Sequence, residues 1–222
     1  KYFAGHSLGE YSALVCSESL KFNDALFLLF ERGKAMQEAV PIGKGSMIAV
    51  LGSQVSELND IIKNFETKGV CEIANDNAEG QTIISGDTDS INLLKEVLKK
   101  DNKKFIPLNV SAPFHCSLMN SAADSMRDKI NSVKFDKPKF DIVSNVTSEL
   151  ENNPENIKKL LIKQIYSTVR WRESIINMTK KEITDFIEIG PGKVLSGMVK
   201  RTVKNINCFS INSIDDMKKI VS

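Results

Sequence analysis

Ser7 stands between two glycines, in the pentapeptide Gly5-His6-Ser7-Leu8-Gly9. This spacing is typical of a nucleophile elbow, a sharp turn from strand to helix that holds a serine hydroxyl clear of the backbone. Both glycines are expected because strand and helix approach closely there, which leaves no room for a Cβ atom. Taken alone, the pentapeptide is equally typical of an ordinary glycine-rich bend.

A serine nucleophile needs a base, and the chain has only two histidines. His6 is next to Ser7, and neighbouring side chains on a turn diverge. His115 follows a predicted strand and Pro113 in a loop, where catalytic groups are often found. His115 is therefore the candidate base, and a histidine with purely structural hydrogen bonds is the alternative. Cys116 is expected to be a small buried packing residue.

Only five of the 30 basic residues are arginines, so an arginine in this chain can mark a place where a guanidinium is needed. Arg32 lies inside an apolar helix predicted at 22–40, one turn before Met36, and not on a charged face. The planar guanidinium suits a carboxylate better than a lysine does. Arg32 is thus a candidate carboxylate-binding residue, and an arginine at the core edge with its charge in water is the alternative.

The segments between these residues predict an α/β fold. Residues 44–110 predict strand, helix, strand, strand, helix and strand, the order of a small ferredoxin-like lobe. Around this lobe we predict helices at 22–40, 117–133, 154–165 and 172–180, a strand at 140–146, and a C-terminal strand, helix and strand. The outer segments are expected to form an α/β layer structure that the lobe interrupts.

Composition excludes several classes of protein. A net charge of +2 and a pI near 8.3 do not indicate binding to nucleic acid or to a membrane surface. No apolar run is long enough to span a bilayer. The four cysteines form no C-x-x-C pair, so neither a metal site nor a disulfide framework is predicted, and a reducing compartment is expected. Lys1 falls inside a predicted strand, so we expect the chain to be a piece of a longer protein.

Six segments resemble, in order, malonyl-CoA:acyl carrier protein transacylases of type II fatty acid synthesis: GHSLGEYSAL, ERGKAMQEAV, NDNAEGQTIISG, VSAPFHC, QIYSTVRW and EIGPGKVLSG. The resemblance extends over almost the whole chain. It implies an α/β-hydrolase-like core at 1–43 and 111–222 with an inserted ferredoxin-like (βαββαβ) subdomain at 44–110. It also implies ping-pong transfer of a malonyl group from malonyl-CoA to the phosphopantetheine thiol of acyl carrier protein, with no bound cofactor.

The resemblance also implies roles for particular residues. Ser7 takes the malonyl group, His115 is its general base and acid, and Arg32 binds the malonyl carboxylate in a bidentate manner. The Leu8 N–H donates to the oxyanion, and the main-chain carbonyl of Gln164 orients the histidine. The other residues expected near the substrate are Met36, Asn75, Asn77 and Phe114. The glycine- and glutamine-rich motif that supplies the family's second oxyanion N–H is not in this sequence.

The expected partners are malonyl-CoA and an acidic acyl carrier protein, with no nucleic acid and no membrane, and a monomer is expected. Four basic residues on or near one predicted helix are candidates for carrier-protein docking, with a solvated helix face as the alternative: Lys193, Lys200, Arg201 and Lys204. A bacterial cytoplasm or a plastid-type organelle is the expected location. Three other functions stay open: a polyketide-type acyltransferase domain, a serine esterase or thioesterase, and a non-catalytic remnant that binds carrier protein.

Overall fold

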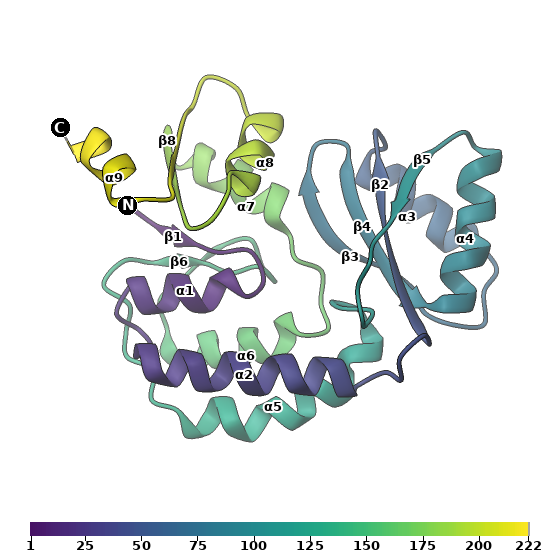
Figure 1. Ribbon diagram of the computed structural model, residues 1–222, viewed down its shortest axis with the longest axis horizontal. Coiled ribbons are helices and arrows are strands. Elements are labelled where there is room, and N and C mark those ends of the chain that lie inside the picture. The colour runs from purple at the N-terminus through teal and green to yellow at the C-terminus, as the bar shows by residue number, and fades with distance from the viewer. Residues whose placement is uncertain (222) are drawn as a thin grey trace.

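The computed structural model describes residues 1–221 and shows an α/β protein. Figure 1 separates a smaller part, drawn at the right, from a larger part at the left. The strands form a three-stranded, a four-stranded and a two-stranded sheet. Within the described residues, no helix has both the length and the apolar character that crossing a membrane requires.

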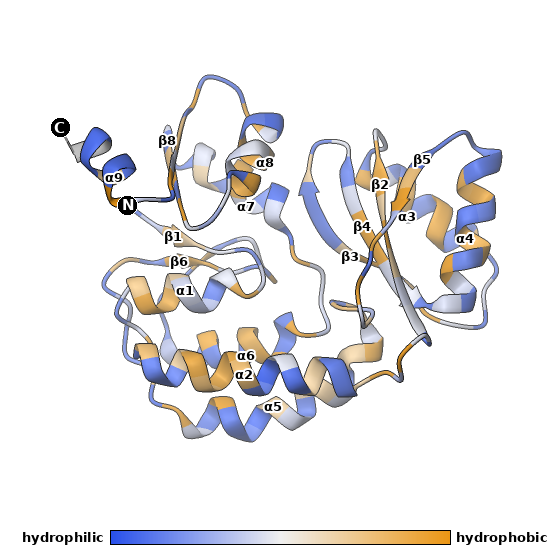
Figure 2. Cartoon of the chain, viewed as in Figure 1, coloured by the Kyte–Doolittle hydropathy of each residue, from blue (hydrophilic) through white to orange (hydrophobic). Residues whose placement is uncertain are grey.

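A short three-stranded sheet and four helices form one portion of the larger part, and this portion includes the N-terminus. β1 (Phe3–Ala4) pairs in parallel with β6 (Ile142–Val143), and β6 pairs antiparallel with β7 (Leu150–Glu151). The helices are α1 (Gly9–Cys16), α2 (Phe22–Glu38), α5 (Asn120–Ser132) and α6 (Pro154–Gln164), with a 3-10 turn at Ser117–Met119. Their apolar residues gather along α1, α2 and α6 (Figure 2) and bury a common core. This core supports the turn between β1 and α1.

Helix α2 confirms the helix predicted at 22–40, although it ends two residues earlier. The side chains that it buries include one charged residue, Arg32. Ala25, Leu28, Arg32 and Met36 face inward at spacings of three and four residues. Phe30 lies on the same helix and is 71% exposed. The inward row therefore carries Arg32 to the base of the Ser7 turn.

The smaller part has the predicted order of elements. It contains β2 (Gly45–Leu51), α3 (Val55–Asn64), β3 (Cys71–Ala78), β4 (Gln81–Asp87), α4 (Thr88–Lys100) and β5 (Lys104–Pro107). The strands are ordered β3-β4-β2-β5, and every neighbouring pair is antiparallel. Alternation along β2 divides its side chains between two cores, with Ile48 and Val50 toward the helices and Met47 and Ala49 toward Phe114 of the larger part.

The C-terminal segment contains α7 (Trp171–Lys180), β8 (Asp185–Ile189), α8 (Val194–Thr202), β9 (Asn207–Ile211) and α9 (Ile214–Val221). β8 and β9 pair in parallel, so α8 is the crossover between them, as predicted. The strand predicted at 140–146 is wrong in length, because only residues 142 and 143 have ladder partners. β7 and α9 were not predicted.

Strand β3 connects the two parts of the fold. The Asp76 N–H donates to the Val169 carbonyl over 3.0 Å, and the Val169 N–H donates to the Ala74 carbonyl over 2.9 Å. Arg172 Nε donates to both oxygens of the buried Asp76 carboxylate, at 2.9 and 3.0 Å. These contacts hold the end of β3 beside the Ser7 turn.

Candidate active site

The turn at Ser7 has the backbone of a nucleophile elbow. Ser7 adopts a φ of 51°, in the left-handed region that residues other than glycine rarely occupy, between the end of β1 and the start of α1. A Cβ on Gly5 would lie 1.9 Å from the carbonyl carbon and oxygen of Gly9. A Cβ on Gly9 would meet nothing within 4 Å. The expectation of a required glycine is therefore confirmed at Gly5 and wrong at Gly9, since only a Cβ at Gly5, directly after β1, would enter the narrow gap between strand and helix.

Asn145 holds this strained turn, and the sequence did not single it out. Its Oδ1 accepts from the Ser7 N–H over 2.7 Å, and its Nδ2 donates to the Gly5 carbonyl over 2.8 Å. The side chain has no solvent exposure. One carboxamide thus satisfies the two backbone groups that lead into Ser7, the Gly5 carbonyl and the Ser7 N–H.

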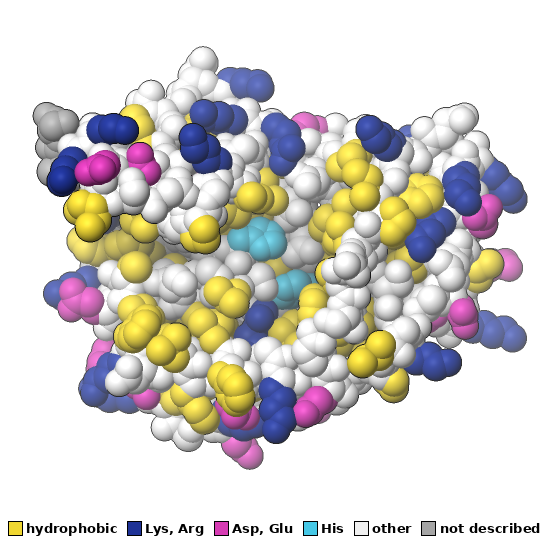
Figure 3. All heavy atoms as spheres, viewed as in Figure 1, with side chains coloured by type: hydrophobic (Ala, Val, Ile, Leu, Met, Phe, Trp, Pro, Cys, Tyr) yellow, Lys and Arg dark blue, Asp and Glu magenta, His cyan; other side chains and the backbone are white. Residues whose placement is uncertain are grey.

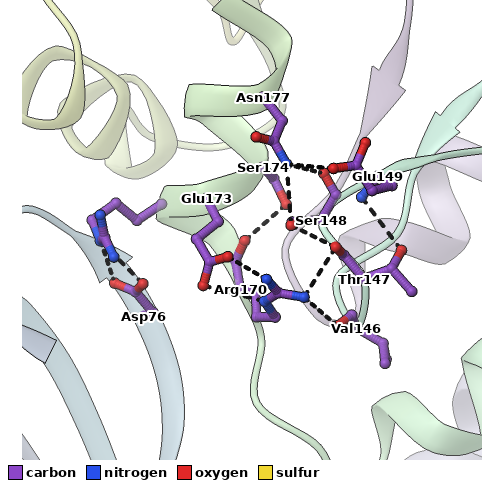
Figure 4. Close-up of polar contacts among 10 residues, drawn as sticks. Asp76, Val146, Thr147, Ser148, Glu149, Arg170, Glu173, Ser174 and Asn177 are labelled. Carbon is purple, nitrogen blue, oxygen red and sulfur yellow. Dashed lines mark hydrogen bonds and ion pairs between the residues drawn. The ribbon is translucent and has the colours of Figure 1, made fainter. Parts of the chain in front are cut away.

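The loop that carries Asn145 is fixed in turn by the start of α7 (Figure 4). The Arg170 N–H donates to the Asn145 carbonyl over 2.9 Å, and Arg170 Nη1 donates to the Thr147 carbonyl over 3.0 Å. Asn177 Nδ2 donates to the Ser148 carbonyl over 3.1 Å. The loop following β6 is therefore a well-bonded support, although it has no regular structure.

His115 reaches Ser7 from the other side of the site. Its Nε2 lies 2.7 Å from Ser7 Oγ, and its Nδ1 lies 2.9 Å from the main-chain carbonyl oxygen of Gln164. A carbonyl can only accept, so Nδ1 carries the proton and Nε2 accepts from the Ser7 hydroxyl. This arrangement suits removal of the serine proton, with a carbonyl in the place where many hydrolases have a carboxylate.

The surroundings of His115 keep its imidazole neutral. Burial, reinforced by the nearby Arg32 charge, lowers the pKa of His115 from 6.5 to about 3. His6 makes no contact with the Ser7 hydroxyl; its Nε2 lies 2.8 Å from Asn77 Oδ1, and its ring packs edge-on against Trp171. Figure 3 shows the histidine side chains inside a central hollow of this face.

Arg32 enters the site from α2, with 7% of its surface exposed. One nitrogen, Nη2, donates to Ser7 Oγ and to Gln164 Oε1, each over 3.0 Å. Its buried Nε has no hydrogen-bond partner within the described residues, and no carboxylate there forms an ion pair with it. The alternative of an arginine with its charge in water is therefore wrong. A buried cation with unfilled donors is arranged to receive an anion.

Glu10 is a buried carboxyl group in the same site, and no pattern in the sequence had marked it. Its Oε2 accepts from Gln164 Nε2 over 2.7 Å and from the Asn145 N–H over 3.2 Å. Burial outweighs these bonds and raises the pKa of Glu10 from 4.5 to about 7. The only signal in the sequence was an acidic residue in the first turn of a helix whose inward face is otherwise apolar.

The remaining predicted residues lie around this centre or away from it. The Leu8 N–H, next to the nucleophile at the start of α1, has no acceptor within the described residues. Met36 is buried one turn beyond Arg32, and Phe114 packs between two hydrophobic cores. Asn77 reaches the site through His6, whereas the backbone of Asn75 pairs with Ile83 of β4 and with Val169. Cys116 is fully buried, and burial raises the pKa of its thiol to about 11, as suits a packing residue.

The four predicted docking residues gather at one helix. Lys200 and Arg201 lie in the last turn of α8, Lys193 immediately precedes the helix, and Lys204 follows it. All four are exposed. Arg201 also donates to Gln81 at the start of β4, so this helix contacts the smaller part of the fold.

Comparison with known proteins agrees with this geometry. A family model described as "Acyl transferase domain" matches residues 1–221. The chain is 40% identical over 213 residues to a malonyl CoA-acyl carrier protein transacylase of Bacillus subtilis, covering 95% of this chain and 67% of the relative. It is 38% identical over 212 residues to the enzyme of the same name from Haemophilus influenzae, with coverages of 95% and 68%.

Solved structures show the same fold. The acyl-carrier-protein-S-malonyltransferase of Bartonella henselae superposes with a TM-score of 0.96 at 37% identity, covering all of this chain and 71% of the other. A malonyl-transacylase in complex with a type II polyketide acyl-carrier protein gives a TM-score of 0.94 at 36% identity, with coverages of 98% and 71%. Fold and sequence together define an α/β acyl transferase domain. Within that class, the chain belongs to the malonyl CoA-acyl carrier protein transacylases.

Proposed function

We propose that this chain moves a malonyl group from malonyl-CoA to the phosphopantetheine thiol of acyl carrier protein through a malonyl ester of Ser7. The observation that carries the proposal is the placement of Arg32. A buried guanidinium 3.0 Å from the nucleophile matches the free carboxylate by which malonyl differs from acetyl. A serine esterase or thioesterase would share Ser7 and His115 but would have no use for this charge.

The proposed reaction has two matched halves. His115 Nε2 takes the Ser7 proton as Oγ attacks the thioester carbonyl, and the Leu8 N–H donates to the oxygen that becomes negative. The C–S bond then breaks, and the imidazolium gives its proton to the departing CoA thiolate. In the second half, His115 deprotonates the carrier-protein thiol, which attacks the ester. The breaking C–O bond returns Ser7, which regains a proton from His115.

During both halves the malonyl carboxylate is proposed to occupy the donors of Arg32 in a bidentate manner. Nη2 is already directed at Ser7, and Nε has no partner in the described residues, so that edge of the guanidinium can bind two oxygens. The neutral, Nδ1-protonated imidazole favoured by burial is the form that this scheme requires. Met36, Phe114, Asn75 and Asn77 are proposed to border the acyl and pantetheine groups.

We also propose a ferredoxin-like subdomain at residues 44–110. The strand order β3-β4-β2-β5 and the βαββαβ sequence of elements support it. The elbow between β1 and α1 supports an α/β-hydrolase-like core at 1–43 and 111–222. The exposed cluster on α8 is proposed as the docking surface for the acidic carrier protein.

The proposal is tested by intact-mass spectrometry after mixing the protein with malonyl-CoA. We expect a single malonyl adduct that is lost in Ser7→Ala. Ser12→Ala is the matched control, because Ser12 is an exposed serine on α1, the helix that follows Ser7, and it should keep the adduct. An adduct that persists in Ser7→Ala would contradict the nucleophile assignment.

A further inference from the structure

The side chain of Gln164 lies at the centre of the site and has no part in the reaction proposed above. Its main-chain carbonyl orients His115, but its carboxamide makes a separate set of contacts. The Oε1 atom accepts from Arg32 Nη2 over 3.0 Å. The Nε2 atom donates to Glu10 Oε2 over 2.7 Å and to the Ser7 carbonyl over 3.1 Å. Gln164 has no solvent exposure, so water cannot replace any of these partners.

The neighbours of Gln164 permit only one orientation of the amide. Every polar atom near Nε2 is an acceptor: the Glu10 carboxylate, the Ser7 carbonyl and, at 3.5 Å, the Oδ1 of Asn145. The neighbour of Oε1 is a guanidinium, which can only donate. A flipped amide would place oxygen against oxygens and N–H against N–H. Glu10 provides the shortest of these bonds and is the only ionisable group among the three acceptors.

This arrangement also keeps Glu10 from competing with the substrate. A carboxylate in direct contact with Arg32 would fill the donors that a malonyl carboxylate needs. The neutral amide between the two charges lets Glu10 influence Arg32 without occupying it. Within the described residues, the guanidinium consequently has no carboxylate partner of its own.

We propose that Glu10 is a positioning residue for malonyl recognition: it fixes the Gln164 carboxamide so that Oε1 holds the Arg32 guanidinium beside Ser7. The inference rests on the proposed function, because it assumes that Arg32 binds the malonyl carboxylate. This positioning role of Glu10 can be distinguished from a role in folding, because a misplaced Arg32 should impair malonyl transfer more than acetyl transfer.

The test compares malonyl and acetyl transfer to acyl carrier protein in variants of the full chain. Glu10→Met removes the acceptor at nearly constant length and should lower the malonyl-to-acetyl ratio of kcat/KM by about tenfold, the effect of one hydrogen bond to a charged group. Glu10→Gln can still present an acceptor oxygen to Gln164 and should stay within about threefold of the wild type. Glu38→Met is the control, because Glu38 is exposed on α2, and it should leave the ratio unchanged.

A second pair of variants tests the route through Gln164 and guards against poor folding of Glu10→Met. Gln164→Met keeps the main-chain carbonyl and should lower the ratio to a similar extent. Adding Glu10→Met to it should lower the ratio no further, because Glu10 acts through that amide. An unchanged ratio in Gln164→Met, or additive losses in the double variant, would overturn the inference.

Arg32→Ala separates this inference from the proposed function. If Arg32→Ala collapses the ratio and Glu10→Met leaves it unchanged, the role of Glu10 is refuted and the proposed function stands. If Arg32→Ala leaves the ratio unchanged, the proposed carboxylate site is refuted together with the inference built on it.

Discussion

Arg32 places a positive charge within hydrogen-bonding distance of Ser7 Oγ, in a region that water scarcely reaches. Malonyl and acetyl groups differ by one carboxylate, so this charge is the natural basis for choosing between them. We expect Arg32→Ala to reduce malonyl transfer by about 10²-fold or more, the cost of leaving a buried carboxylate without its partner, while acetyl transfer is unchanged or rises. Steady-state kinetics with both acyl-CoA substrates measure this.

Arg32→Lys refines the same prediction. An ammonium keeps the charge but loses the planar pair of donors, so malonyl transfer should recover only in part. If both acyl groups lose activity equally in Arg32→Ala, the arginine has a structural role and the malonyl assignment loses its main support.

Glu10 leads to a prediction about stability and pH. Burial raises its pKa from 4.5 to about 7, so the folded protein binds this proton more tightly than the unfolded chain does. Between pH 4.5 and 7 the unfolded state has lost the proton and the folded state retains it, so the free energy of unfolding falls as pH rises. Above pH 7 the free energy of unfolding stops falling, and it is then about 3 kcal/mol lower than at acidic pH.

Glu10→Gln cannot ionise and should therefore be more stable than the wild type above pH 7, by up to about 3 kcal/mol. The gain should shrink as pH falls toward 4.5. Urea unfolding at a series of pH values measures the difference between the two proteins. His115, whose lowered pKa has the opposite effect on stability, is present in both and cancels. A difference that does not vary with pH would show that Glu10 is ionised in the folded state throughout this range.

At the scale of elements, the approach of β1 to α1 determines where Ser7 points. A Cβ on Gly5 would overlap the Gly9 backbone, which cannot move as a flexible side chain could. We expect Gly5→Ala to lower the free energy of unfolding by about 2 kcal/mol or more through overpacking, and to slow formation of the malonyl adduct. Urea unfolding and intact-mass spectrometry give the two measurements.

Gly9→Ala is the matched control for Gly5→Ala. The position is helical and its Cβ would have open space, so the change should be neutral or stabilise by up to about 1 kcal/mol. Similar losses of stability in the two variants would show that the close approach is not confined to the strand side of the elbow.

At the scale of the whole molecule, α8 presents its basic residues on the surface and contacts β4 of the smaller part through Arg201 and Gln81. A carrier protein that docks there would meet positive charge near the junction of the two parts. We expect Lys200→Glu with Lys204→Glu to raise the KM for carrier protein by about tenfold, and the effect should weaken at high salt. The KM for malonyl-CoA should not change.

Lys99→Glu with Lys100→Glu is a control of equal charge, because these residues lie at the end of α4 in the smaller part and are exposed. An equal rise in the KM for carrier protein with this pair would indicate a general charge effect and not a docking surface. Arg201 is left intact in both proteins because it donates a hydrogen bond to Gln81 of the smaller part.

Much of this molecule could be predicted from residues that lie close together in the sequence. The pattern around Ser7 predicted the elbow, and hydrophobic periodicity predicted α2, α6, α7 and all six elements of the smaller part in their order. These features depend on residues within a few positions of one another, which is the range over which backbone preference and side-chain spacing act. The ordered motifs then pointed to Ser7, His115 and Arg32 as one site, and in the structure His115 Nε2 lies 2.7 Å and Arg32 Nη2 lies 3.0 Å from Ser7 Oγ.

The contacts that hold this site together could not be predicted, because they join residues that are far apart in the sequence. Asn145 bonds to the Gly5 carbonyl and the Ser7 N–H from more than a hundred residues away, and Gln164 joins Glu10 to Arg32 across three helices. No local pattern marks an asparagine, glutamine or glutamate for such a task, because each bond depends on how separate elements pack. For the same reason periodicity predicted α2 as a helix but not that its buried row would include Arg32 and leave Phe30 in solvent. A helix has a spacing of its own, but the direction that faces the core is determined by its neighbours.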